Sequence, residues 1–97
     1  MNIKQNLNFN SEKPAVFSVI KNDKLNLFAI GLQKGQTLSN HKAVYPSFLT
    51  VLEGNIILSI SENKIELYQF DTYDIPTNTV HEVTAKEQSF FTLTQPK

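Results

Sequence analysis

Two histidines are the residues of this sequence best suited to chemistry, and each lies in a stretch rich in turn residues. His41 lies in the stretch from Gly35 to Gly54, and His81 lies in the stretch from Phe70 to Ala85. A neutral imidazole can ligate a metal ion, move a proton or hydrogen-bond a ligand. Strand-like apolar sequence surrounds both stretches, so we predict that the two histidines face one pocket inside a small β-barrel.

Three roles are open to His41 and His81 at this point. Each could be a pocket histidine whose hydrogen bonds go to the backbone or to water, each could contact a bound ligand, or the two could ligate a metal ion. Asp71 and Asp74 lie three residues apart beside a turn, where solvated or capping carboxylates are typical. The sequence contains no nucleophile elbow, phosphate-binding loop or glycine-rich dinucleotide motif.

Composition limits the classes of partner. The 97 residues suit one domain, and the chain has nine basic and nine acidic residues, so its net charge is zero. All nine basic residues are lysines, whereas a nucleic-acid surface needs a basic excess and bidentate phosphate recognition usually needs arginine. No apolar run is long enough for a membrane span, and no cysteine is present. We therefore expect a cytoplasmic protein that binds neither nucleic acid nor membrane.

Short strands separated by Gly, Pro and Asn dominate the pattern. Period-two alternation and β-branched residues predict strands over residues 15–21, 25–32, 48–53, 55–60, 65–68, 80–84 and 89–94, and a short strand or extended loop over residues 37–41. No segment of ten or more residues has sustained helical periodicity. This pattern predicts an all-β fold, an antiparallel double-sheet β-barrel of the jelly-roll kind, over residues 15–97. We expect residues 1–14 to form an N-terminal arm or an edge strand. Pro14 lacks a backbone N–H and limits strand pairing there.

The strands on either side of Gly54 follow one another with almost no connection. Phe48–Glu53 ends at Gly54, and Asn55–Ile60 begins directly after it. Two strands joined by so short a turn usually pair, so we expect a β-hairpin. In the second of these strands Ile56, Leu58 and Ile60 share one face, which we expect to be buried.

The two histidine stretches resemble the paired motifs of the cupin superfamily, in particular small single-domain, RmlC-like (type-2) cupins. The first motif runs G-x5-H-x-H-x3-E-x6-G. Gly35, His41 and Gly54 match it, but Ala43 stands where the second histidine belongs and Ser47 where the glutamate belongs.

The second motif runs G-x5-P-x-G-x2-H-x3-N, and it is also matched in part. Pro76 and His81 match, while Phe70 and Asn78 replace its two glycines and Ala85 replaces the final asparagine. The resemblance covers residues 25–93, so it implies the cupin β-barrel for most of the chain.

The resemblance implies an interior pocket lined by His41, Ala43, Ser47 and His81. Cupins hold a divalent metal with the two histidines and glutamate of the first motif and the histidine of the second. Here a methyl group and a hydroxyl replace two of those ligands, and two imidazoles alone fall short of the three protein ligands usual at catalytic metal sites. We therefore expect no cofactor, with a divalent metal on His41 and His81 as the less favoured alternative.

Two classes of function are compatible with these motifs. The first is a cupin barrel that binds a small molecule without a tightly bound metal. The second is a metal-dependent cupin enzyme of the isomerase or oxygenase kind, whose incomplete ligand set is completed by water or atypical ligands. The resemblance also implies a homodimer, in which the arm with Ile3, Leu7 and Phe9 could cover the partner's sheet.

Overall fold

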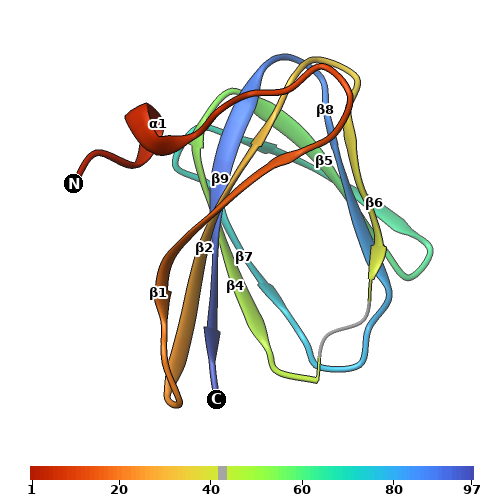
Figure 1. Ribbon diagram of the computed structural model, residues 1–97. Coiled ribbons are helices and arrows are strands. Elements are labelled where there is room, and N and C mark those ends of the chain that lie inside the picture. The colour runs from red at the N-terminus through yellow and green to blue at the C-terminus, as the bar shows by residue number, and fades with distance from the viewer. Residues whose placement is uncertain (42–43) are drawn as a thin grey trace.

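The computed structural model describes residues 1–41 and 44–97, and for residues 40 and 41 it describes the backbone alone. Within these residues nine strands form two antiparallel sheets, which confirms the predicted all-β double-sheet architecture. The sheets face each other across a common interior (Figure 1).

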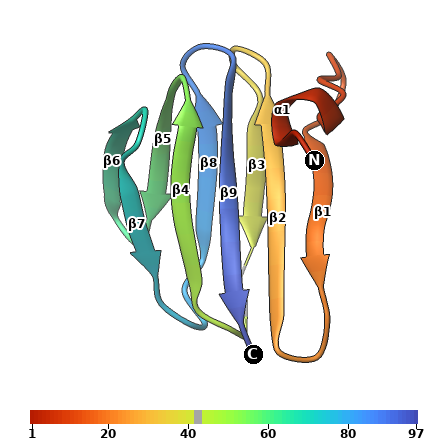
Figure 2. The same cartoon turned by 90° about the vertical axis from the view of Figure 1, so that its left-hand side faces the viewer.

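The larger sheet has five strands in the order β1, β2, β9, β4, β7. They are β1 (Ala15–Lys21), β2 (Leu25–Leu32), β9 (Ser89–Pro96), β4 (Ser47–Glu53) and β7 (Thr72–Ile75). Figure 2 shows this order from outside the molecule. Strands β1 and β2 form an antiparallel hairpin around a turn at Asn22 and Asp23, and β9 runs between β2 and β4.

The smaller sheet has four strands in the order β3, β8, β5, β6. They are β3 (Thr37–His41), β8 (His81–Ala85), β5 (Asn55–Ile60) and β6 (Asn63–Tyr68). Strand β8, from the second histidine stretch, pairs with β3, from the first. The fold thus brings the two stretches together at one edge of this sheet.

The hairpin predicted around Gly54 is wrong. Strand β4 pairs with β7 and β9 in the larger sheet, whereas β5 pairs with β6 and β8 in the smaller one. Gly54, at φ 96°, therefore connects two sheets instead of closing a hairpin. Each strand has one apolar inward face, and two strands that line opposite walls of one core need not pair with each other.

The main core fills the space between the sheets. Its buried apolar side chains come from both sheets, and they include the predicted inward set of β5, Ile56, Leu58 and Ile60. Leu49 and Val51 of β4, in the larger sheet, belong to this core together with Val83 and Ala85 of β8, in the smaller sheet. Because side chains alternate between the faces of a strand, these residues define which positions of β4 and β8 point into the barrel.

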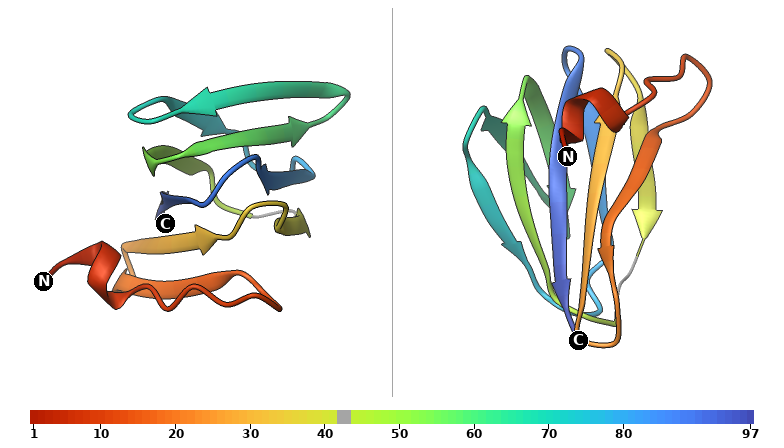
Figure 3. Two further views of the ribbon diagram at one scale, coloured as in Figure 1. Left: turned by 90° about the horizontal axis from the view of Figure 1, so that it is seen from above. Right: turned by 60° about the vertical axis from the view of Figure 1, so that its left-hand side comes forward.

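The N-terminal arm packs on the outer face of the five-stranded sheet of its own chain. It contains α1 (Ile3–Asn6), a single turn capped by the Asn2 side chain, which accepts from the backbone N–H of Gln5 at 3.0 Å. Leu7 is buried in a second apolar cluster with Ala29 of β2 and Phe90 of β9. Figure 3 shows α1 on this outer side of the sheet. No helix in the described part of the chain is long and apolar enough to cross a membrane.

Candidate functional site

One end of the apolar interior carries a row of polar side chains that runs across three neighbouring strands of the larger sheet. Ser47 of β4 is 2% exposed and precedes the inward-facing Leu49 by two residues. Gln95 of β9 donates a hydrogen bond from Nε2 to Ser47 Oγ at 2.9 Å. Asn26 of β2 lies opposite Gln95 in the pairing of β2 with β9. Asn26, Gln95 and Ser47 therefore form a continuous neutral polar row.

His81 lies on the facing wall, on the smaller sheet. It is 2% exposed and alternates with the core residues Val83 and Ala85, so its side chain points into the barrel. Its Nδ1 donates to the backbone carbonyl of Thr79 at 3.1 Å. That bond places a proton on Nδ1, so the lone pair of the neutral ring is on Nε2.

The backbone of His41 lies opposite His81 in the pairing of β3 with β8. Between Leu38 and His41 the pairing shifts by one residue, which is a β-bulge in β3. The register therefore brings the backbones of the two motif histidines side by side, and that both side chains face one pocket stays a prediction.

A cleft of about 210 Å³ lies beside the polar row. It is lined by Val16 of β1, Phe28 and Ile30 of β2, Leu38 of β3, and Leu93 and Gln95 of β9. These strands include β1 and β3, which are edge strands of the larger and the smaller sheet. The cleft therefore opens where one sheet edge faces the other, and Val16, 60% exposed, stands at its mouth.

The structure describes the four predicted pocket residues to different extents. Ser47 and His81 are buried and point inward, His41 is placed by its backbone, and Ala43 lies outside the described residues. Five of the six residues that line the cleft come instead from β1, β2 and β9, which the motifs do not cover, and only Leu38 lies within the first motif. The sequence signal that could have found Gln95 is the alternation of β9, in which Phe91 and Leu93 face inward.

Two of the residues that the motif resemblance aligns with cupin metal ligands, Ala43 and Ser47, have side chains that are not usual metal ligands. Position 43 carries only a methyl group, and the Ser47 hydroxyl already accepts the Gln95 hydrogen bond. Among the side chains that the structure describes, no group of three His, Asp or Glu residues is placed to hold a metal ion. The described side chains at these positions therefore fall short of the three protein ligands usual at catalytic metal sites.

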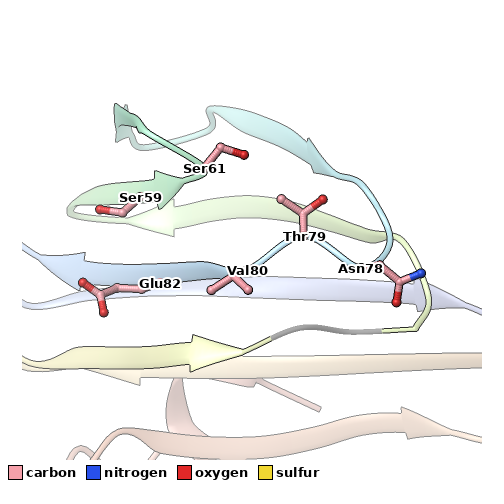
Figure 4. A pocket seen from close by; sticks show the side chains of 6 residues that line it. All are labelled: Ser59, Ser61, Asn78, Thr79, Val80 and Glu82. Atoms are coloured by element: carbon pink, nitrogen blue, oxygen red, sulfur yellow. The ribbon is translucent and has the colours of Figure 1, made fainter.

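A second depression lies on the outer face of the smaller sheet (Figure 4). Its volume is about 470 Å³, and it is lined by Ser59, Ser61, Asn78, Thr79, Val80 and Glu82. Ser59 and Glu82 lie opposite each other on β5 and β8, on the face that points away from the core. Although it is larger, this depression is lined almost entirely by polar side chains, none of them buried, whereas five of the six side chains around the cleft are apolar, so we place the candidate site in the cleft.

The clearest electrostatic cluster also lies outside the barrel. Lys86 donates a hydrogen bond to Glu66 at 3.1 Å, and this contact lowers the pKa of the Glu66 carboxyl and raises the pKa of Lys86. The pKa of Tyr68 is raised, chiefly by its hydrogen bond with Glu66. All three groups are open to solvent, which favours a surface ion-pair cluster over a reaction centre.

Comparison with known proteins supports the fold and gives no function. No family model matches the sequence, and no curated protein matches it. Solved structures do match. An RmlC-like cupin from Desulfovibrio desulfuricans superposes with a TM-score of 0.90 at 18% identity, over 99% of this chain and 93% of that one.

Two further structures have the same architecture. A cupin superfamily protein from Desulfitobacterium hafniense matches with a TM-score of 0.85 at 14% identity, over 90% of this chain and 80% of its own. An uncharacterized double-stranded β-helix protein from Klebsiella pneumoniae matches with a TM-score of 0.91 at 14% identity, over 99% and 87% of the two chains. At these identities the likeness concerns the fold alone.

Proposed function

We propose that this protein, which has the cupin fold, holds a small molecule inside its barrel and does so without a tightly bound metal. The observation that carries the proposal is the cleft of about 210 Å³ that opens between the sheets beside Ser47 and Gln95. Binding sites are typically concave and mainly apolar, with a few placed polar groups that orient the ligand. The cleft has this composition, with five apolar side chains and the amide of Gln95.

His81 supports the proposal from the facing wall. Its bond to the Thr79 carbonyl holds the ring in one tautomer and one orientation, and the ring is buried. A rigid polar group on a strand positions a ligand more precisely than one on a loop. We expect His81 to contribute a polar contact at the inner end of the site, with the buried Ser47 on the facing wall.

The test is to map binding on the protein by NMR. Amide and methyl shifts of isotope-labelled protein, recorded with a library of small neutral and charged compounds, should move at Phe28, Leu38 and Leu93. Shifts confined to Ser59 and Glu82, on the outer face, would overturn the interior site. Mass spectrometry of the protein purified under native conditions would identify any molecule that copurifies.

The metal-dependent enzyme is the second candidate, and one observation favours it. A metal-ligating histidine usually donates its other ring nitrogen to a carbonyl or carboxylate, as His81 Nδ1 does to Thr79. Elemental analysis of protein purified without chelator or affinity tag separates the two candidates. Zinc, nickel or manganese at one ion per chain would replace the metal-free proposal with the enzyme.

We also propose that the protein forms a homodimer through the outer face of the larger sheet. Phe48 of β4 is 37% exposed there, next to Thr94 of β9, beyond the part that the arm covers. The arm itself packs on its own chain through Leu7 and Phe9. Light scattering at tens of micromolar should give the dimer mass, and Phe48→Lys should shift it toward the monomer. A monomer mass for the unmodified protein would refute the homodimer.

The cytoplasmic location expected from the sequence stays a prediction.

A further inference from the structure

We infer that the hollow on the outer face of the smaller sheet binds a small polyhydroxylated amine, whose ammonium group pairs with Glu82 and whose hydroxyl groups hydrogen-bond to the lining. This site is separate from the proposed interior site and takes a ligand of another chemical class. The volume of the hollow, about 470 Å³, lies in the range usual for small-molecule sites, about 300–1,000 Å³.

The floor of the hollow is formed by two paired strands. Ser59 of β5 and Glu82 of β8 lie opposite each other in the sheet, and both point outward because their neighbours along the chain are buried. The rim comes from two connections. Ser61 lies in the turn after β5, and residues 78–80 lie between β7 and β8 (Figure 4). Residues from separate parts of the chain thus surround one space.

Two side chains of the lining can only accept hydrogen bonds from a ligand. The Glu82 carboxylate has no proton to donate when it is ionised. The Thr79 hydroxyl donates its proton to the carbonyl of Thr77 at 3.2 Å, so its lone pairs are what it offers to a ligand. A bound molecule therefore has to supply the donors. An ammonium group supplies three, and each hydroxyl group supplies one.

The charge of the ligand follows from Glu82, which is the one acidic or basic residue of the described lining. Neither of the two ion pairs found among the described residues includes it. Lys64 lies next to Ser59 on β6, on the side away from Glu82, and does not line the hollow. The carboxylate is therefore open to a cationic ligand, whereas an anionic ligand would be repelled.

The remaining lining favours hydroxyl groups over a plain alkyl chain. The hydroxyls of Ser59 and Ser61 can each donate or accept, and the amide of Asn78 can do both. Val80, 51% exposed, adds an apolar surface for the carbon chain of the ligand. Five of the six residues around the interior cleft are apolar, so the two sites suit different molecules.

Hydrogen bonds already hold the connection that forms one side of the hollow. The backbone carbonyl of Thr79 accepts a bond from the buried ring of His81 at 3.1 Å. Asn78 has a left-handed backbone with φ 56°, which asparagine tolerates. A lining that is ordered before binding loses less conformational freedom when the ligand arrives.

Three six-carbon chains that differ only at one end test this inference: 1-amino-1-deoxysorbitol, sorbitol and gluconate. At pH 7 the first carries an ammonium group, the second is neutral and the third carries a carboxylate. Titrated into isotope-labelled protein at low salt, they should shift the amide NMR signals of Ser59, Thr79 and Glu82. We expect the amine to bind about two- to fivefold more tightly than sorbitol, the range for an exposed ion pair, and gluconate to bind least.

Four variants locate the contacts. Glu82→Gln keeps the size of the side chain and removes its charge, so the amine and sorbitol should then bind alike. Glu87→Gln is the matched control, because it changes the net charge equally and Glu87 is exposed between β8 and β9, outside the lining. Lys64→Gln should leave the order of the three probes unchanged. Ser59→Tyr should fill the hollow and abolish binding of all three.

The outcomes separate this site from the interior one. Equal binding of the amine and sorbitol to the unmodified protein would overturn the ion pair with Glu82. An equal loss in Glu87→Gln and Glu82→Gln would overturn it too, because net charge would then explain the preference. Shifts at Phe28, Leu38 and Leu93 instead would overturn the hollow and support the interior site. No shift with any probe would overturn the hollow and leave the proposed interior site unaffected.

Discussion

His41 and His81 lie opposite each other in the pairing of β3 with β8, although they belong to two separate motifs of the sequence. The relationship places the two imidazole-bearing residues of the chain at neighbouring backbone positions at one end of the barrel. A pair of histidines is one or two ligands short of a usual catalytic metal site. The two motif histidines thus meet at one end of the barrel, and by themselves they supply fewer ligands than a usual catalytic metal site has.

Restoring the missing donors should restore metal binding. The unmodified protein should bind zinc or nickel weakly, because two neutral imidazoles provide few ligands and no compensating charge. Ala43→His with Ser47→Glu should bind at least about tenfold more tightly, a change of about 1.4 kcal/mol. Calorimetric titration measures both affinities.

The melting temperature provides a second readout of the same double variant. It should rise when metal is added, since a ligand that binds only the native state stabilises that state. Without metal it should lie below that of the unmodified protein, because position 47 is buried and a glutamate there loses its hydration. Equal metal affinity in the two proteins would mean that these positions do not converge.

The hydrogen bond between Gln95 and Ser47 should couple the two residues energetically. Gln95→Leu leaves the buried Ser47 hydroxyl without this donor and should lower the free energy of unfolding by about 1–3 kcal/mol. Ser47→Ala should cost less, because Gln95 is only partly buried. The double variant should be close to Ser47→Ala alone. Urea unfolding of all four proteins completes the cycle, and additive losses would show that the bond contributes nothing.

Gly54 should be far less replaceable than Gly35, although both match the first motif and both have positive φ, 96° and 86°. A Cβ on Gly54 would collide with Ser89 Oγ and lie 2.7 Å from the carbonyl oxygen of Gln88, whereas nothing lies within 4 Å of one on Gly35. Gly35→Ala should therefore cost only the left-handed strain, about 1–2 kcal/mol. Gly54→Ala should cost about 3 kcal/mol or more, because overpacking adds to that strain.

Thermal and urea unfolding of the two glycine variants give the comparison directly. Ser89 is buried and accepts from the backbone N–H of Asn55 at 2.9 Å, so it has little freedom to move aside. Similar losses in the two variants would show that the connection between the sheets relaxes easily at Gly54.

The Phe70→Gly variant of the protein should be more stable than the Phe70→Ala variant. It occupies a glycine position of the second motif, it keeps a left-handed backbone with φ 71°, and its side chain is 73% exposed. Removing the ring therefore sacrifices little packing, and glycine adopts this conformation without strain. We expect Phe70→Gly to exceed Phe70→Ala by about 1 kcal/mol in the free energy of unfolding. A more stable alanine variant would contradict the strain at this turn.

Replacing Lys86 with glutamine should raise the pKa of the Glu66 carboxyl toward its ordinary value, because the hydrogen bond from Lys86 is the main cause of the lowered pKa. The lowered pKa of Glu66 means that its stabilising contribution is present above the ordinary carboxylate pKa and is lost as pH falls through the lowered value. The pKa of Lys86 is raised, so its stabilising contribution depends on pH in the opposite direction. That contribution is present below the ordinary lysine pKa and is lost as pH rises through the raised value.

The measurement is an NMR titration of the Glu66 carboxyl in both proteins, with Lys21→Gln, on the larger sheet, as the control. Both partners are open to solvent, so the effect should shrink as salt is added. An unchanged Glu66 pKa in Lys86→Gln would mean that the ion pair does not persist in solution.

Local sequence was enough to predict the described strands except β7 (Thr72–Ile75), together with the buried face of β5. The alternation of Ile56, Leu58 and Ile60 is a local property of the chain, because a strand has a period of two whatever it pairs with. The positive φ of Asn78 is local too, since asparagine is among the residues that tolerate a left-handed turn. The spacing of the motifs is also readable from the sequence itself, and it correctly indicated the fold.

Pairing between strands far apart in the sequence decided which sheet each strand joins. It also decided which polar side chains meet inside the barrel. Gly54 looks like a hairpin turn because strand pairing depends on partners far away in the sequence, and the strands on either side of it line opposite walls. Asn26 and Gln95 belong to no motif, and they form one polar row with Ser47 because β9 runs between β2 and β4. That tertiary arrangement, rather than any local pattern, built the candidate site.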